Sequence, residues 1–214
     1  DLKSGYLSSD ITIDNDDSGN THKMTIVEVL RCDAARQSLV LACTLHIVQQ
    51  LSGINGVFSY AGELFKETWW VPLALSVLNV LMTIVSMSLM ERLGRRPLLL
   101  SSVLFCIIAL LSATAASYLQ WPTVASLSVL LYVAAFAVGL GPIPWLMIAE
   151  LFPSTAVASA VSLAVACNWT FNFAVTSGFP VVSKALGDFK FAPFVAVLAV
   201  FLWFAVVRVP ETRG

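Results

Sequence analysis

The sequence predicts an all-α membrane protein with six transmembrane helices. Charged residues make up only 12 % of the chain and hydrophobic residues 58 %, and the mean hydropathy is +0.84. A soluble domain carries about 25 % charged residues, so most side chains here must avoid water. The apolar residues also come in blocks of about 20, the length of a helix that crosses a bilayer. The net charge of −1 gives no reason to expect a nucleic-acid partner.

Six blocks have the required length, and the charged side chain they contain is Arg208, next to the end of the last block. In order they are Ser38–Tyr60, Val71–Met90, Leu98–Tyr118, Val124–Ala149, Ala156–Val182 and Phe191–Val209. Buried helices of a large soluble protein have a similar pattern. Six of them in 214 residues leave too little chain to cover such a core, which favours the membrane.

Polar segments flank the six blocks. Residues 1–24 are polar and acidic and are predicted to be a disordered tail. Thr25 and Glu28 fit a capping box, which predicts a short helix over residues 26–36. The bundle then occupies residues 37–209, and residues 210–214 begin a second tail. Because the first residue is not Met, we expect a processed product or an excerpt of a longer chain.

The basic residues predict the orientation, because Lys and Arg accumulate in short cytoplasmic loops. Three of them fall on one side of the six spans: Lys66, Lys184 and Lys190. Nine fall on the other side: Lys3, Lys23, Arg31, Arg36, Arg92, Arg95, Arg96, Arg208 and Arg213. Both ends of the chain are therefore expected in the cytoplasm, as an even number of spans also requires.

The first predicted span contains three amides and a glycine, namely Gln49, Gln50, Asn55 and Gly53. On a straight helix Asn55 would point about 140° away from Gln50, so the amides face one cavity only where the helix bends. Gly53 permits such a bend. Amides both donate and accept hydrogen bonds, which suits a neutral polyhydroxyl ligand. Amides also hold helices together in membranes, and both interpretations stay open.

The fourth predicted span contains two glycines and two prolines within six residues, followed by a tryptophan. They are Gly139, Gly141, Pro142, Pro144 and Trp145. Proline removes a backbone donor and clashes with the preceding turn, so the helix is expected to break here. Broken helices at mid-membrane point to a transport site, although a static kink has the same residues. Trp145 is available to stack on a sugar ring or to pack in the core.

The remaining polar residues of the spans are isolated. Asn79 is a single amide in the second span, which is more often a helix–helix contact than a ligand contact. Asn168 and Asn172 share one face of the fifth span, with Trp169 between them. His46 is expected to be buried and hydrogen-bonded rather than a proton carrier. The spans contain no Asp or Glu and no catalytic or metal-ligating arrangement, so we expect no enzymatic activity, no cofactor and no metal.

A charged loop joins the second and third predicted spans, and two further glutamates follow the fourth and the last span. Ion pairs among these residues would close the cytoplasmic side and break when it opens. Partly exposed pairs are weak individually, which suits a gate. The predicted gate consists of Glu91, Arg92, Arg95, Arg96, Glu150 and Glu211.

Six motifs, in order, resemble the sugar porter family of the major facilitator superfamily. They are QQLSGIN (49–55), ERLGRR (91–96), GPIPW (141–145), ELFP (150–153), NWTFNF (168–173) and PETRG (210–214). The family has twelve helices in two six-helix bundles joined by a cytoplasmic loop. The resemblance implies that this chain is the C-terminal bundle and that residues 1–36 belong to the central loop.

The resemblance also implies which residues bind the sugar. They are Gln49, Gln50, Asn55, Asn79, Trp145 and Trp169. Two positions depart from the family's pattern. Ala137 stands where well-studied glucose carriers have a sugar-binding glutamate, which weakens the case for glucose itself. Val157 replaces an arginine that most members have, which implies a weaker gate.

The function implied is transport of a hexose or related sugar or polyol by alternating access. The expected partners are the sugar, the lipid bilayer and the N-terminal six-helix half of the same protein. The plasma membrane is favoured over the vacuole and other endomembranes. The alternative is a non-transporting sugar sensor, or an orphan member of the same family.

Overall fold

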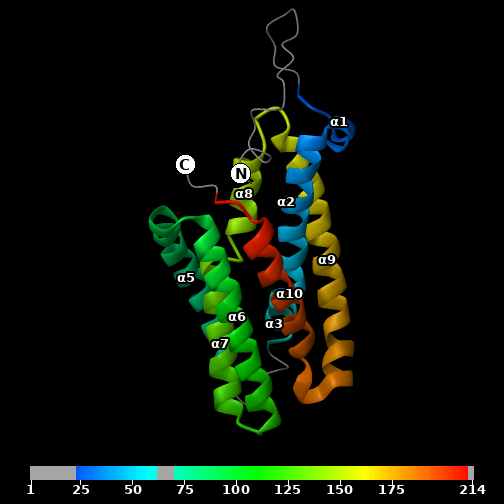
Figure 1. The fold of residues 1–214 in the computed structure, drawn as a ribbon. Coiled ribbons are helices and arrows are strands. Elements are labelled where there is room, and N and C mark those ends of the chain that lie inside the picture. The colour runs from blue at the N-terminus through cyan, green and yellow to red at the C-terminus, as the bar shows by residue number, and fades with distance from the viewer. Residues whose placement is uncertain (1–22, 62–69, 212–214) are drawn as a thin grey trace, which may run out of the picture.

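The computed structural model describes residues 23–61 and 70–211, and it places almost all of them in helices (Figure 1). Within these residues there is no strand, and one short 3₁₀ turn, η2 (Gly187–Phe189), follows the longest helix. The α-helices are α1 (Ile26–Arg31), α2 (Asp33–Leu51), α3 (Ile54–Ser59), α5 (Val71–Leu93), α6 (Arg95–Tyr118), α7 (Pro122–Val138), α8 (Ile143–Leu151), α9 (Val157–Leu186) and α10 (Ala192–Arg208).

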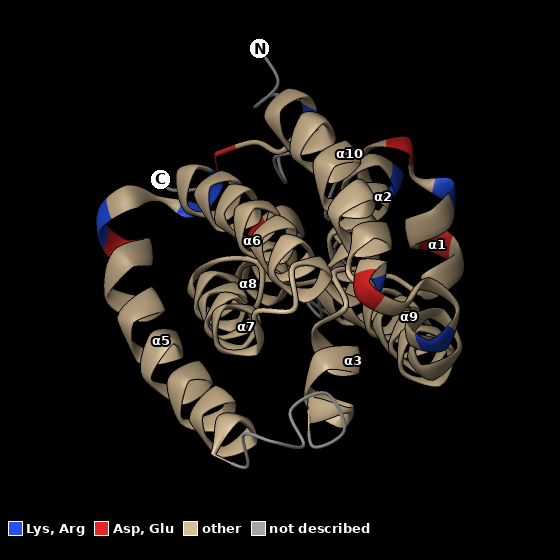
Figure 2. Cartoon of the chain, turned by 90° about the horizontal axis from the view of Figure 1, so that it is seen from below, with Lys and Arg blue, Asp and Glu red and all other residues tan. Residues whose placement is uncertain are grey.

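The long helices form a bundle with two groups. In one group α6 and α5 pack on α7, and in the other α2 packs along α9. Contacts of α10 with α6 and of α8 with α2 join the groups. Figure 2 shows that the Lys, Arg, Asp and Glu residues lie at helix ends, whereas the helix bodies are uncharged. This distribution is that of a bundle that crosses a bilayer.

Four helical stretches are long and apolar enough to cross a membrane, judged by length and composition. They are Val71–Leu93, Arg95–Tyr118, Pro122–Leu151 and Val157–Phe189. The sixth predicted span corresponds to α10, which is apolar but has only 17 residues. The first predicted span is not one helix but two, α2 and α3, and the fourth is likewise divided into α7 and α8. Both divisions lie where the sequence has its glycines and prolines.

The predicted helix over residues 26–36 is wrong in extent. The capping box is present, since the Glu28 carboxylate accepts from the Thr25 backbone N–H at 2.6 Å. The helix nevertheless ends at Arg31, and Cys32 is extended. Residues from Asp33 onward belong to α2, where an acidic side chain in the first turn complements the helix dipole.

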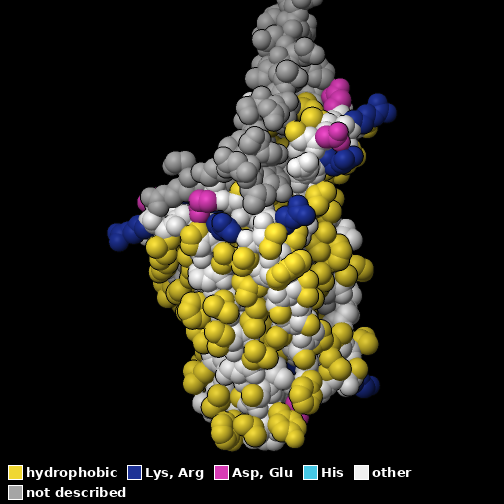
Figure 3. Space-filling view, viewed as in Figure 1, with side chains coloured by type: hydrophobic (Ala, Val, Ile, Leu, Met, Phe, Trp, Pro, Cys, Tyr) yellow, Lys and Arg dark blue, Asp and Glu magenta, His cyan; other side chains and the backbone are white. Residues whose placement is uncertain are grey.

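The outer faces of the bundle are apolar. Large side chains such as Leu73, Phe173 and Val200 are mostly exposed. The face that carries α6 and α10 is covered by hydrophobic side chains, with Lys and Arg gathered toward its upper edge (Figure 3). Exposing so much apolar surface to water is unfavourable, whereas the hydrocarbon of a bilayer accommodates it. The chain is therefore part of an integral membrane protein.

Candidate functional site

The first helix break lies between α2 and α3 and depends on Gly53. The glycine has φ +89°, in the left-handed region that other residues rarely adopt. A Cβ atom at this position would lie 2.8 Å from the Phe194 ring, so there is no space for a side chain. The break turns Asn55 back toward Gln50, and the Asn55 amide donates a hydrogen bond to the Gln50 side-chain oxygen. The bend that the amide pattern requires is therefore present.

The second break lies between α7 and α8. α7 ends at Val138 and α8 begins at Ile143, so residues 139–142 are not helical. Pro142 caps α8 and Pro144 lies in its first turn. At Gly139 a Cβ atom would lie 2.5 Å from the Ser102 Cβ atom, so α6 approaches this segment as closely as a glycine allows.

Each break is stabilised by a side chain from the other broken helix. Gln49 on α2 donates to the carbonyls of Leu140 and Gly141, at 3.2 and 2.6 Å. Tyr132 on α7 donates its hydroxyl to the Ser52 carbonyl at 2.9 Å. In hydrocarbon a carbonyl released from a helix needs such a partner. The two breaks are thus tied to one another through buried side chains.

Asn168 on α9 completes a buried network of amides. Its side-chain oxygen accepts from Gln50 at 3.0 Å, and its NH₂ group donates to Gln49 at 2.8 Å. The same NH₂ group lies 3.1 Å from Nδ1 of His46. Asn168, Gln49, Gln50 and His46 are all buried, and Asn55 joins them at the edge. α2, α3 and α9 thereby contribute side chains to one polar cluster inside an apolar bundle.

Trp145 on α8 borders this amide cluster. Its ring packs edge-on against His46, with the ring centroids 4.6 Å apart and the planes at 88°. The indole is 45 % exposed, so part of it is free to contact a ligand. His46 is buried and hydrogen-bonded, as expected, but its Nε2 atom has no hydrogen-bond partner within the described residues.

The structure does not bring the other two predicted sugar-binding residues into the cluster. Asn79 lies on α5, which packs on α7 and α6, and no hydrogen bond joins its side chain to the amides described above. Trp169 follows the buried Asn168, and because successive helical residues differ by about 100° it points away and is 64 % exposed.

Two functional contributions are not evident from the sequence. The roles of Tyr132 and Ser102 depend on contacts between helices. Ser102 accepts from the Leu140 backbone N–H at 3.0 Å and donates to Ala135 at 2.7 Å. Asn168 carried a signal, since it shares the motif NWTFNF with Trp169, but nothing in that motif indicates that it contacts three residues of α2.

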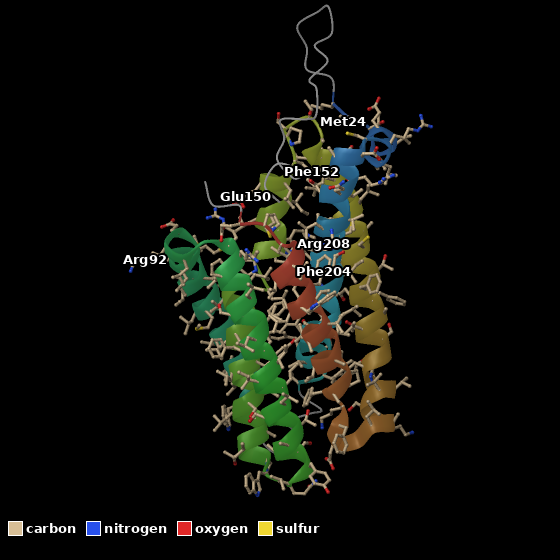
Figure 4. The ribbon with its side chains drawn as sticks, in the orientation of Figure 1. Met24, Arg92, Glu150, Phe152, Phe204 and Arg208 are labelled. Carbon is tan, nitrogen blue, oxygen red and sulfur yellow. The ribbon has the colours of Figure 1, made fainter. Side chains whose placement is uncertain are left out.

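The charged loop forms contacts at the end of the bundle where Arg92, Glu150 and Arg208 lie (Figure 4). The guanidinium of Arg95 binds the Glu150 carboxylate at 2.8 and 3.0 Å. About a quarter of each side chain is exposed, 24 % and 25 %. This pair joins the start of α6 to the end of α8.

Glu211 contacts α6 through backbone atoms. Its carboxylate accepts from the N–H groups of Arg95 and Arg96, at 3.0 and 3.2 Å. These donors have no partner inside the helix, and a negative charge is favourable there. The Arg96 side chain donates to the Val206 carbonyl on α10 at 2.7 Å. Glu91 and Arg92 lie exposed at the end of α5.

Comparisons with known proteins agree with this architecture. The family model described as "Sugar (and other) transporter" matches residues 10–214. The chain is 38 % identical over 204 residues to "Solute carrier family 2, facilitated glucose transporter member 3" of Mus musculus, and 32 % over 211 residues to member 2 of Rattus norvegicus. These alignments cover 90 % and 94 % of this chain but only 41 % and 40 % of the relatives.

Solved structures of a bacterial transporter have the same fold. The inward-open xylose transporter XylE from E. coli matches 84 % of this chain and 40 % of that chain, with a TM-score of 0.76 and 33 % identity. The proton:xylose symporter XylE bound to 6-bromo-6-deoxy-D-glucose matches 82 % and 40 %, also with a TM-score of 0.76, at 32 % identity. The chain spans about two fifths of the length of the relatives it matches. It belongs to the sugar porter family of the major facilitator superfamily, a family of transporters.

Proposed function

We propose that the protein carrying this chain moves a hexose or a related sugar or polyol across a membrane by alternating access. The observation that supports this most is the buried amide cluster between two helix breaks. Amides suit sugar hydroxyls because both groups donate and accept hydrogen bonds. The relatives are named as glucose transporters, and one similar structure holds a glucose derivative. No observation favours the sensor alternative.

Gln50 and Asn55 are the proposed primary sugar contacts. In this structure they bind one another, and that hydrogen bond joins α2 to α3. A sugar hydroxyl placed between them replaces the bond without leaving either amide unsatisfied, which keeps the energetic penalty small. Because α3 has six residues and follows Gly53, it can pivot when the bond is exchanged. Binding is thereby coupled to movement.

The other proposed contacts differ in how available they are. The exposed part of Trp145 offers a flat surface beside the cluster. The Gln49 amide is already engaged with the α7–α8 break, so Gln49 shapes the site and contacts sugar only if that segment moves. Asn79 is half-buried and Trp169 is exposed, so they are accessible to a ligand bound against α5 or α9.

The Arg95–Glu150 pair and the Glu211 contacts would act as the cytoplasmic gate. They join α6 to α8 and to the segment after α10, so opening this side requires them to separate. A partly exposed pair contributes about 1 kcal/mol or less, which allows repeated opening. Exposed Glu91 and Arg92 would strengthen the same side. We place both ends of the chain in the cytoplasm, in the plasma membrane, with an N-terminal bundle closing the sugar pathway.

Uptake by the full protein in proteoliposomes tests this function. The experiment measures entry of radiolabelled hexoses, pentoses and polyols, with L-glucose as the control for leakage. We expect saturable uptake of at least one D-sugar or polyol. A protein that is folded in the vesicles but carries none of them would contradict the proposal.

A further inference from the structure

A groove lies between α2 and α10 on the outside of the bundle, away from the amide cluster. Its volume is about 610 Å³, and its lining is apolar except at one end. It is lined by Arg36, Gln37, Val40, Leu41, Trp203, Phe204, Val207 and Arg208. Nothing in the proposed sugar pathway uses these residues, so the groove requires its own explanation.

The polar and apolar parts of the groove are arranged along the helices in one direction. α2 begins and α10 ends at the same end of the bundle, so Arg36 and Arg208 lie together at that end. Val40 is one turn further along α2, and Phe204 is one turn back along α10 (Figure 4). Charge therefore lies at the mouth, and hydrophobic surface continues about 5 Å deeper into the bilayer.

The mouth of the groove is positively charged. Arg36 pairs with Asp33 at 2.9 Å, but both side chains are well exposed, so the pair is weak and leaves other guanidinium donors available. Arg208 forms no ion pair with any residue that the structure describes. Two arginines and one aspartate give a net charge of +1 at the mouth, and Gln37 adds an amide donor.

The deeper part of the groove faces hydrocarbon. Trp203 is 72 % exposed, and Val40 and Val207 are also exposed. The face that carries α6 and α10 is largely hydrophobic (Figure 3). A tryptophan near the end of a membrane helix is well suited to the interface between headgroups and acyl chains. An occupant must therefore combine an anionic head with an apolar tail.

We propose that this groove binds an anionic phospholipid of the cytoplasmic leaflet, with the phosphate between Arg36 and Arg208 and an acyl chain along Val40, Trp203 and Phe204. A guanidinium group can donate two parallel hydrogen bonds to the oxygens of one phosphate. Basic pockets between membrane helices bind lipid headgroups. The bound lipid would tie the start of α2 to the end of α10, at the opposite end of α2 from the first helix break. The site depends on the membrane orientation proposed above but not on sugar transport.

Native mass spectrometry tests the site. The full protein is purified from bilayers with equal amounts of phosphatidylglycerol and phosphatidylcholine, and the retained lipids are counted. We expect the wild type to retain more phosphatidylglycerol than phosphatidylcholine. In the double variant Arg36→Gln/Arg208→Gln, the ratio of retained phosphatidylglycerol to phosphatidylcholine should fall about fivefold or more. The double variant Lys23→Gln/Arg31→Gln removes the same charge from exposed positions outside the groove, and it should keep the lipid preference of the wild type. An equal loss in both variants, or no preference in the wild type, would overturn the proposal.

Tryptophan quenching gives a second measurement that does not depend on the arginine variants. Brominated phosphatidylglycerol should quench the fluorescence of the wild type more than brominated phosphatidylcholine does, and Trp203→Phe should remove that difference. Soluble glycerol 3-phosphate should not relieve the quenching. Relief by it would assign the mouth to free phosphate compounds, and a difference that persists in Trp203→Phe would place the lipid elsewhere.

Discussion

Replacing Gly139 by alanine tests whether the break between α7 and α8 depends on close packing against α6. The new Cβ atom would lie 2.5 Å from the Ser102 Cβ atom and 2.7 Å from the Leu98 carbonyl oxygen. An ordinary contact begins at 3.4 Å, so α6 and the break must separate by about 0.9 Å. One of these neighbours is backbone, which cannot rotate away. We expect Gly139→Ala to reduce the free energy of unfolding by about 3 kcal/mol, the upper part of the usual range for overpacking.

The assay is denaturant-induced unfolding of the purified protein in detergent micelles. Gly178→Ala is the matched control, because it makes the same substitution elsewhere in the bundle. Gly178 lies on α9, and nothing lies within 4 Å of the Cβ atom that the substitution adds. This variant should unfold like the wild type or gain up to about 1 kcal/mol from the better helix propensity of alanine. Equal stability of Gly139→Ala and the wild type would refute the packing argument, as would an equal loss in both variants.

Three further changes probe the ties described above. Gln49→Leu should lower the free energy of unfolding in micelles by about 3 kcal/mol, because the Leu140 and Gly141 carbonyls lose their donor. An unfolding curve equal to that of the wild type would show that these carbonyls find other partners. Tyr132→Phe removes only the hydroxyl and should reduce stability by about 1 kcal/mol in the same assay, and a fully stable variant would mean that the Ser52 carbonyl does not need it. Glu150→Gln should favour the inward-open state, seen as faster cysteine labelling from the cytoplasmic side, because it weakens the pair with Arg95. Glu91→Gln, at an exposed position, should increase the labelling rate much less. Equal labelling rates in the two variants would argue against the gate.

The two helix breaks could be predicted from the sequence because each has a local cause. The amides on both sides of Gly53 can share a face only if the helix bends there, and in the structure Gly53 has a left-handed backbone conformation. The partners of the amides could not be predicted, because they depend on the register of α2 against α9. Asn168 is four residues from Asn172 on the same helix face, yet only Asn168 reaches the cluster.

The partners of the charged residues, and the extent of the N-terminal helix, could likewise not be predicted from the sequence. From the sequence, the three arginines of the charged loop are candidates to pair with Glu150 and Glu211, but the partner atoms depend on the three-dimensional geometry. Arg95 pairs with Glu150, whereas Glu211 lies over the N-terminus of α6 and binds backbone N–H groups. The short N-terminal helix was predicted too long because the sequence lacks a recognisable cap at Cys32, where the backbone becomes extended.

Sugar uptake by a double variant tests the central claim most directly. The full protein with Gln50→Ala and Asn55→Ala is reconstituted beside the wild type, and uptake is measured for the sugar that the wild type carries. Since both proposed primary contacts and the bond between them are lost, we predict that the initial rate at low sugar concentration falls by roughly tenfold or more, as expected for two hydrogen bonds of about 1 kcal/mol each. Uptake that equals the wild type at every sugar concentration would contradict the assignment of this amide cluster as the sugar site.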